Sequence, residues 1–139
     1  MTEHFHKHLD ILQSLINRMA GNSSTCKNYC VTLVTGILAL DQVKSAHGFT
    51  WLALIPIVLF CFLDAYYLSL ERHFKKQFKD ITKLWQDDKL KPKHLFTIQP
   101  SDKGIHGIGL VLEAFGSYSI FPFYGALSIV IGVLMCMGK

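Results

Sequence analysis

The chain has 139 residues, enough for one domain; half of them are hydrophobic and 17% are charged. A soluble domain typically has about 25% charged residues, and here the deficit is concentrated in three stretches, which disfavours a soluble protein. A secretory signal is also disfavoured, because the first residues are polar and amphipathic and lack an apolar core with a cleavage site. We therefore expect an all-α integral membrane protein with three transmembrane helices and cytoplasmic amphipathic helices.

Residues 1–23 are predicted to form a cytoplasmic amphipathic helix. Its apolar residues recur at intervals of three and four, which is the spacing of a helix that packs on another helix; they are Phe5, Leu9, Leu12, Ile16 and Met19. The run Gly21–Ser24 is expected to break this helix, with Ser23 or Ser24 capping the next one.

Residues 24–70 are predicted to form a transmembrane hairpin. The segment Thr50–Leu70 is long enough to cross a bilayer, and Asp64 is its only charged residue. The segment between Lys27 and Lys44 is shorter and contains Asp41. Because lysine side chains can extend to the headgroups, this segment is also expected to span. A re-entrant or buried helix is the alternative.

Residues 71–104 are predicted to form a basic cytoplasmic helix and a loop. An apolar stripe continues from the second span: Leu70, Phe74, Phe78, Ile81 and Trp85. A basic face lies opposite, with Lys75, Lys76, Lys79 and Lys83. We expect this helix to pack on the N-terminal helix or on a neighbouring copy; the alternative is adsorption on the lipid surface. Prolines and Gly104 then indicate a loop, with a short strand at His94–Ile98.

Residues 105–139 are predicted to contain a bent helix followed by the third span, Tyr118–Met137, which has no charged residue. The orientation follows from the basic residues. Two of the fourteen, Lys44 and Lys139, fall on one side of the predicted spans, and the other twelve fall on the opposite side. The positive-inside rule therefore places the N-terminus and the connector 71–104 in the cytoplasm. The predicted location is a bacterial inner membrane.

Asp64 is the strongest candidate site residue. A carboxylate within a span is costly and usually faces the bundle interior or water. Arg18 is its expected partner, with Lys27 as the alternative. Such an ion pair would hold the cytoplasmic helix against the second span; alternatively, Asp64 lines or gates a pore.

Small residues share one face of the first span and one face of the third. They are Thr32, Gly36 and Ala39 in the first, and Gly125, Ser128 and Gly132 in the third. Such faces allow helices to approach closely in lipid. They predict a homo-oligomer, and packing within one chain is the alternative.

No catalytic motif, phosphate-binding loop or C-x-x-C pair is present, so we expect no enzyme activity and no cofactor. His4 and His8 are four residues apart, as helical metal ligands are, but no third ligand is near in sequence, so no metal site is expected. The four cysteines are expected to be reduced and structural. The expected partners are the lipid bilayer, further copies of the chain and a cytoplasmic sensor or effector protein, with no direct binding of nucleic acid.

Residues 8–80 resemble small bacterial inner-membrane proteins of the type of SLATT two-span effectors found with antiphage systems. The resemblance is carried by the order of three pieces: NRMAGNSS, then the lysine-flanked CKNYCVTLVTGILAL, then PIVLFCFLDAYYLSLERHFKKQF. It implies an oligomeric effector that permeabilises the inner membrane when a sensor is triggered. The third span departs from a strict two-span plan. The alternative function is a membrane anchor or adaptor that recruits a cytoplasmic partner through its basic helical face.

Overall fold

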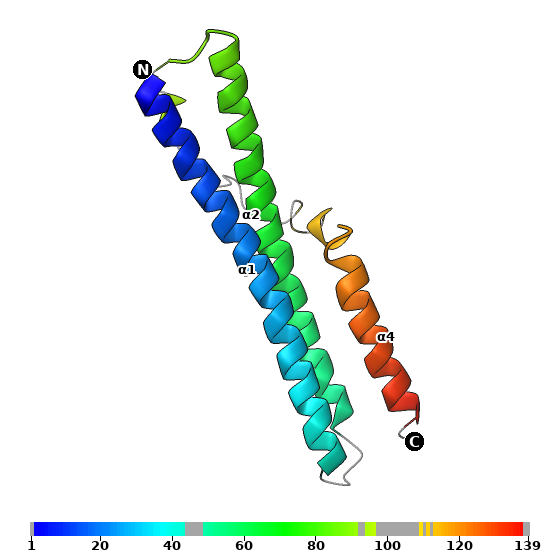
Figure 1. Cartoon of the computed structure of the whole chain (residues 1–139). Coiled ribbons are helices and arrows are strands. Elements are labelled where there is room, and N and C mark those ends of the chain that lie inside the picture. The colour runs from blue at the N-terminus through cyan, green and yellow to red at the C-terminus, as the bar shows by residue number, and fades with distance from the viewer. Residues whose placement is uncertain are drawn as a thin grey trace.

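The computed structural model describes residues 2–43, 49–91, 94–96, 109, 111 and 113–137. Its regular elements are α1 (Thr2–Val43), the 3₁₀ helix η1 (Thr50–Ala53), α2 (Leu54–Gln86) and α4 (Phe121–Met137). Figure 1 shows α1 and α2 side by side as a long antiparallel hairpin, with α4 against the half of α2 nearest the hairpin turn. The predicted all-helical class is confirmed, and no strand occurs among the described residues.

The predicted break at Gly21–Ser24 is wrong, because α1 runs through it without interruption. Glycine in a helix interior costs only about 1 kcal/mol relative to alanine. Two side-chain hydrogen bonds are made in this run, one within α1 and one to α2. Thr25 Oγ1 donates to Gly21 O over 2.9 Å, and Ser23 Oγ donates to Asp64 Oδ1 of α2. Packing on α2 therefore outweighs the weak helix propensity of this run.

The two predicted apolar stripes do pack on one another. On α1, Phe5, Leu12, Ile16 and Met19 are all buried. The rings of Phe5 and Trp85 stack at 4.3 Å between centroids, with 10° between their planes. The continuation of α2 to Gln86 confirms the predicted extension of the second apolar segment. We call residues 2–23 of α1 with residues 71–86 of α2 the polar end of the hairpin.

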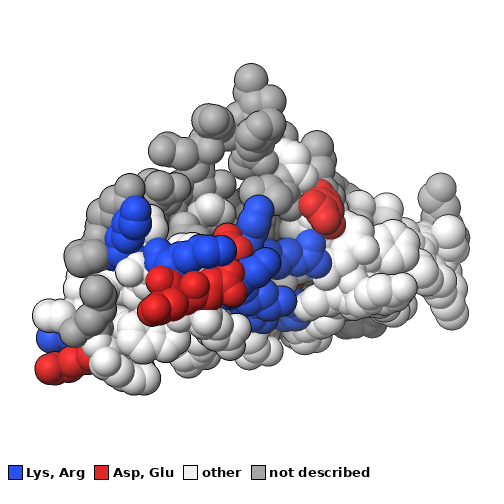
Figure 2. Space-filling view, turned by 90° about the horizontal axis from the view of Figure 1, so that it is seen from above, with Lys and Arg blue, Asp and Glu red and all other residues white. Residues whose placement is uncertain are grey.

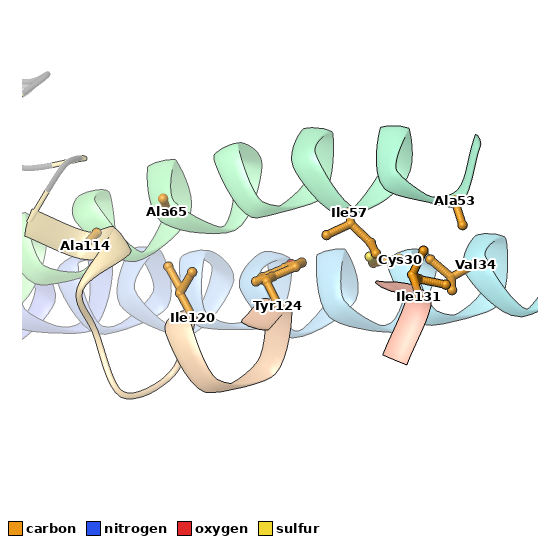
Figure 3. Close-up of a cluster of buried hydrophobic side chains, with 9 residues drawn as sticks. All are labelled: Cys30, Val34, Ala53, Ile57, Ala65, Ala114, Ile120, Tyr124 and Ile131. Atoms are coloured by element: carbon orange, nitrogen blue, oxygen red, sulfur yellow. The ribbon is translucent and has the colours of Figure 1, made fainter. Parts of the chain in front are cut away.

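The remainder of the hairpin, together with α4, forms what we call the apolar end. Its buried cluster takes residues from all three helices and from the residues before α4: Cys30, Val34, Ala53, Ile57, Ala65, Ala114, Ile120, Tyr124 and Ile131 (Figure 3). Tyr124 also donates a hydrogen bond from its hydroxyl to Phe60 O, 3.2 Å away. These contacts fix α4 beside α2.

A second buried carboxylate, Asp41 near the end of α1, accepts hydrogen bonds from the start of η1. Thr50 Oγ1 donates to Asp41 Oδ2 over 2.6 Å, and the backbone N–H of Phe49 donates to Oδ1 over 3.2 Å. Asp41 thus anchors the start of η1 to the end of α1. The rest of the predicted outer loop, residues 44–48, lies outside the described residues.

Only the continuous helical stretch Thr50–Gln86 is long and apolar enough to cross a membrane among the described residues. The helix α4 is apolar but has 17 residues, and the first predicted span lies within the 42-residue α1. Large apolar side chains remain exposed on all three helices of the apolar end, among them Leu33, Leu59 and Val130. Among the described residues, one helix is therefore long and apolar enough to cross a membrane, where the sequence predicted three such helices.

Two smaller predictions concern the connector. Residues 94–96 form a turn where the predicted strand would begin, and the rest of that strand lies outside the described residues. Half of the predicted bent helix at 105–116 also lies outside them, and residues 109, 111 and 113–115 are helical.

Candidate functional site

The candidate site is an ion pair buried between α1 and α2. Asp64 is fully buried, and its Oδ2 lies 2.6 Å from the Nζ of Lys27. Ser23, one helical turn before Lys27, donates its hydroxyl hydrogen to Asp64 Oδ1 and also lies 3.3 Å from Lys27 Nζ. Serine at position 23 and lysine at position 27 fall on the same face of α1, so both meet the carboxylate of α2.

The expected pairing of Asp64 with Arg18 is therefore incorrect, and Lys27, the alternative partner, takes its place. Arg18 is exposed on α1. It lies nine residues before Lys27, which is about 13 Å along a helix axis at about 1.5 Å per residue. The antiparallel register of the hairpin decides the pairing, and the sequence alone did not determine that register.

The geometry of the pair favours a structural role for Asp64. None of its surface is accessible, whereas the Lys27 side chain is 20% exposed. A carboxylate that lined a conduit in one chain would be open on one side. Here Ser23 and Lys27 of α1 contact it and the Tyr124 side chain of α4 lies beside it, so it joins the helices at the boundary between the polar and apolar ends.

The small-residue face of α1 is exposed, whereas that of α4 is partly turned toward α2, since Gly125 is half-buried and lines a groove between the two helices with Ser128. Thr32, Gly36 and Ala39 are exposed on α1, and Ser128 and Gly132 are exposed on α4. A Cβ built on Gly36, Gly125 or Gly132 meets no atom within 4 Å. Packing within one chain, which was the alternative explanation for these faces, does not use the face of Thr32, Gly36 and Ala39 in this structure.

The face of α1 that contains Gly36 is also polar, a feature that the sequence-based prediction overlooked. Thr25, Asn28, Thr32 and Thr35 recur at intervals of three and four on the exposed side of α1. The buried residues Cys26, Cys30 and Val34 lie on the opposite side. Helical periodicity of threonine and asparagine was the signal that could have revealed it. We call residues 25, 28, 32, 35, 36 and 39 the outward stripe of α1.

The predicted basic face is exposed but mixed in charge. Lys75, Lys76, Lys79 and Lys83 all lie on the surface of α2. Lys75 forms an ion pair with Glu71 one turn earlier. Figure 2, a view toward the polar end, shows acidic groups directly beside the basic ones. This face therefore does not present a field of purely positive charge.

His8, considered above only as a metal ligand, contacts the connector instead. Its side chain is buried, and its Nδ1 accepts a hydrogen bond from the backbone N–H of Phe96 over 3.2 Å. The rings of His4 and His8 both lie against the Phe96 ring. Burial lowers the pKa of His8 below its usual value of 6.5. His8 therefore attaches residues 94–96 to the start of α1.

Comparison with known proteins yields no relative: no family model, curated protein or solved structure matches the chain. No group of three or more potential metal ligands occurs among the described residues. The cysteines of the described ranges are free thiols; Cys26 and Cys30 are buried and Cys61 is half-buried.

Proposed function

We propose that this chain is an oligomeric bacterial inner-membrane effector that permeabilises the membrane through a pore lined by α1. In this proposal α1, α2 and α4 all cross the bilayer at the apolar end, and the polar end lies in the cytoplasm. A role in antiphage defence is what the resemblance to SLATT-type effectors implies. The trigger is then a cytoplasmic sensor or effector protein that acts on the polar end.

The outward stripe of α1 is the observation that carries the proposal. A polar face on the lipid side of a membrane helix is unfavourable, so such faces normally turn toward protein or water. The hydroxyls of Thr32 and Thr35 already donate to backbone carbonyls one turn earlier, over 2.9 Å and 2.8 Å. Their oxygens can still accept hydrogen bonds from water, whereas Gly36 and Ala39 allow close approach of a neighbouring helix. A ring of copies would satisfy both requirements.

The test is dye release from vesicles by purified protein, together with its mass in detergent. Gly36→Leu adds a side chain where one chain has open space, so the monomer should fold unchanged. We expect it to lower both the oligomer fraction and dye release by about tenfold or more, since about 1.4 kcal/mol changes an equilibrium tenfold. Asn28→Leu with Thr35→Leu leaves the small-residue face of Thr32, Gly36 and Ala39 intact, so it should retain the oligomer but abolish release.

Ala126→Leu is the matched control, because Ala126 is an exposed small residue of α4 that lies off the face of Gly125, Ser128 and Gly132. It should leave mass and dye release unchanged. A strictly monomeric wild-type protein would remove the basis for a pore made by this chain alone.

The alternative function is a membrane anchor or adaptor, and the exposed lysines of α2 are the observation that favours it. Under this alternative, Lys76→Glu with Lys79→Glu would abolish recruitment of a cytoplasmic protein without changing vesicle leakage. The pore proposal predicts instead that substitutions in the outward stripe of α1 reduce vesicle leakage.

A further inference from the structure

A groove of about 350 Å³ runs between α2 and α4 on the outside of the apolar end. Its walls are apolar side chains of both helices and of the residues before α4, including Val58, Phe62, Phe115 and Phe121. The rings of Phe62 and Phe115 meet edge to face at 5.1 Å between centroids and form one wall. This volume lies within the range of about 300–1,000 Å³ that is usual for ligand sites.

A cation stands above one end of this groove. The Arg72 guanidinium donates to Ser117 Oγ over 3.1 Å, and Ser117 lies two residues beyond the groove residue Phe115. Arg72 is exposed, and Ser117 is its hydrogen-bond partner among the described residues. A guanidinium has five N–H donors, so several remain available for an anion.

The aromatic residues beside this cation mark the level of the lipid headgroups. Tyr118 is 98% exposed and Phe121 is 73% exposed at the start of α4. Tyrosine is enriched at the interface between membrane and water, because its ring is apolar and its hydroxyl is polar. The N-terminus of α4 faces the same level, and the positive end of its dipole adds to the attraction for an anion.

We propose that the groove between α2 and α4 binds one anionic phospholipid of the cytoplasmic leaflet. Its phosphate contacts Arg72 and Ser117, and one acyl chain lies along the groove toward Val58 and Ser128. Charge complementarity selects the headgroup, because basic pockets between transmembrane helices on the cytoplasmic side favour anionic lipids. The inference rests on the membrane location in the proposed function, but not on the presence of a pore.

Photocrosslinking tests the site in the full-length protein. The protein is reconstituted in vesicles of phosphatidylcholine that contain a small fraction of phosphatidylglycerol with a diazirine in one acyl chain. We expect crosslinked peptides to be concentrated at Val58, Cys61 and Phe121. A diazirine phosphatidylcholine probe of the same chain length should label these residues less.

Arg72→Gln should reduce the phosphatidylglycerol crosslinks by about fivefold and leave the phosphatidylcholine crosslinks unchanged. Arg18→Gln is the matched control, because it removes an exposed guanidinium from α1, and it should change the crosslinks of neither probe. Val58→Trp, at a side chain that is 55% exposed on the groove wall, should reduce crosslinks from both probes by filling the groove.

Equal losses in Arg72→Gln and Arg18→Gln, or crosslinks spread evenly over the lipid-facing side chains, would overturn the lipid site. Vesicles made in parallel and loaded with dye separate this result from the proposed function. Specific crosslinking without dye release would remove the pore and retain the lipid site. Dye release without specific crosslinking would remove the lipid site and retain the pore.

Discussion

At the scale of single residues, the contact of Lys27 with Asp64 shows how a charge can be accommodated at the edge of an apolar layer. A buried ion pair is weak evidence of net stability, because desolvation offsets the attraction of the two charges. Removing the lysine nevertheless has a large effect, since the buried Asp64 charge then has no water to replace its partner. Ser23 supplies one further hydrogen bond, and the partial exposure of Lys27 gives only the cation a route to water.

This asymmetry predicts different effects for the two single substitutions. Lys27→Met leaves Asp64 fully buried beside Ser23 and should cost about 3 kcal/mol of stability. Asp64→Asn should cost less, because the lysine can extend toward the headgroups. The double variant should cost less than the sum of the two. Thermal unfolding in detergent measures all three.

Arg18→Met is the control for this series, and it should change the melting temperature little because Arg18 is exposed. If it cost as much as Lys27→Met, the hairpin register in the membrane would differ from the one described here.

His8 gives a second prediction at the same scale, and it concerns pH. The Phe96 N–H needs an unprotonated Nδ1, and the pKa of buried His8 is below 6.5. The attachment of residues 94–96 should therefore be complete above pH 6.5 and be lost as the pH falls from 6.5 through the lowered pKa. Hydrogen exchange at the Phe96 amide, corrected for its intrinsic pH dependence, measures this loss.

His8→Gln retains an acceptor but does not titrate, so it should abolish the pH dependence of Phe96 protection. His4→Gln should preserve it, because His4 is exposed and its contact with Phe96 is between the two rings. Unchanged pH dependence in His8→Gln would rule out this histidine as the titrating group.

At the scale of elements, the spacing of apolar residues predicted which helix faces would meet. The stripes from Phe5 to Met19 and from Leu70 to Trp85 are where the two helices meet, because three-and-four spacing places residues on one face of any helix. The continuity of α1 through Gly21–Ser24 could not be predicted in this way. Local propensity argued for a break, and the contact of Ser23 with Asp64, 41 residues away in sequence, was decisive for a continuous helix.

The candidate site was also predictable only in part. The unusual position of Asp64 was evident in the sequence, because a single charge in an apolar run stands out. The choice between Arg18 and Lys27 depended on the hairpin register, that is, on which residues of α1 lie beside Asp64. The position of a single charged residue in the sequence does not determine that register. The groove between α2 and α4 could not be predicted from the sequence either, because its walls come from segments that are far apart in the chain.

At the scale of the whole molecule, the exposed apolar surface is concentrated at one end. Side chains such as Tyr29, Ile55 and Ile129 are each more than half exposed there. Water would make so large an apolar surface unfavourable, whereas lipid covers it without cost. This distribution supports the proposal that α1 and α4 cross the bilayer together with α2, although among the described residues only the stretch that contains α2 qualifies by length and composition.

Topology reporters test this arrangement. From the twelve-to-two division of basic residues, a reporter fused after Lys139 should be periplasmic and one inserted at Pro92 should be cytoplasmic. Both fusions must first be shown to insert at wild-type levels. If both report the same side, α4 does not cross the membrane, and the lipid groove beside it must be abandoned as well.

The absence of a break in α1 has a mechanical consequence. The 42 residues of this helix extend for about 60 Å at about 1.5 Å per residue, roughly twice the hydrocarbon thickness of a bilayer. An uninterrupted helix is stiff in torsion, so a twist applied near Phe5 and Trp85 is transmitted as a rotation of Asn28 and Thr32. The rod would thus carry a signal from the polar end to the outward stripe as an angle, without unfolding any part of the chain.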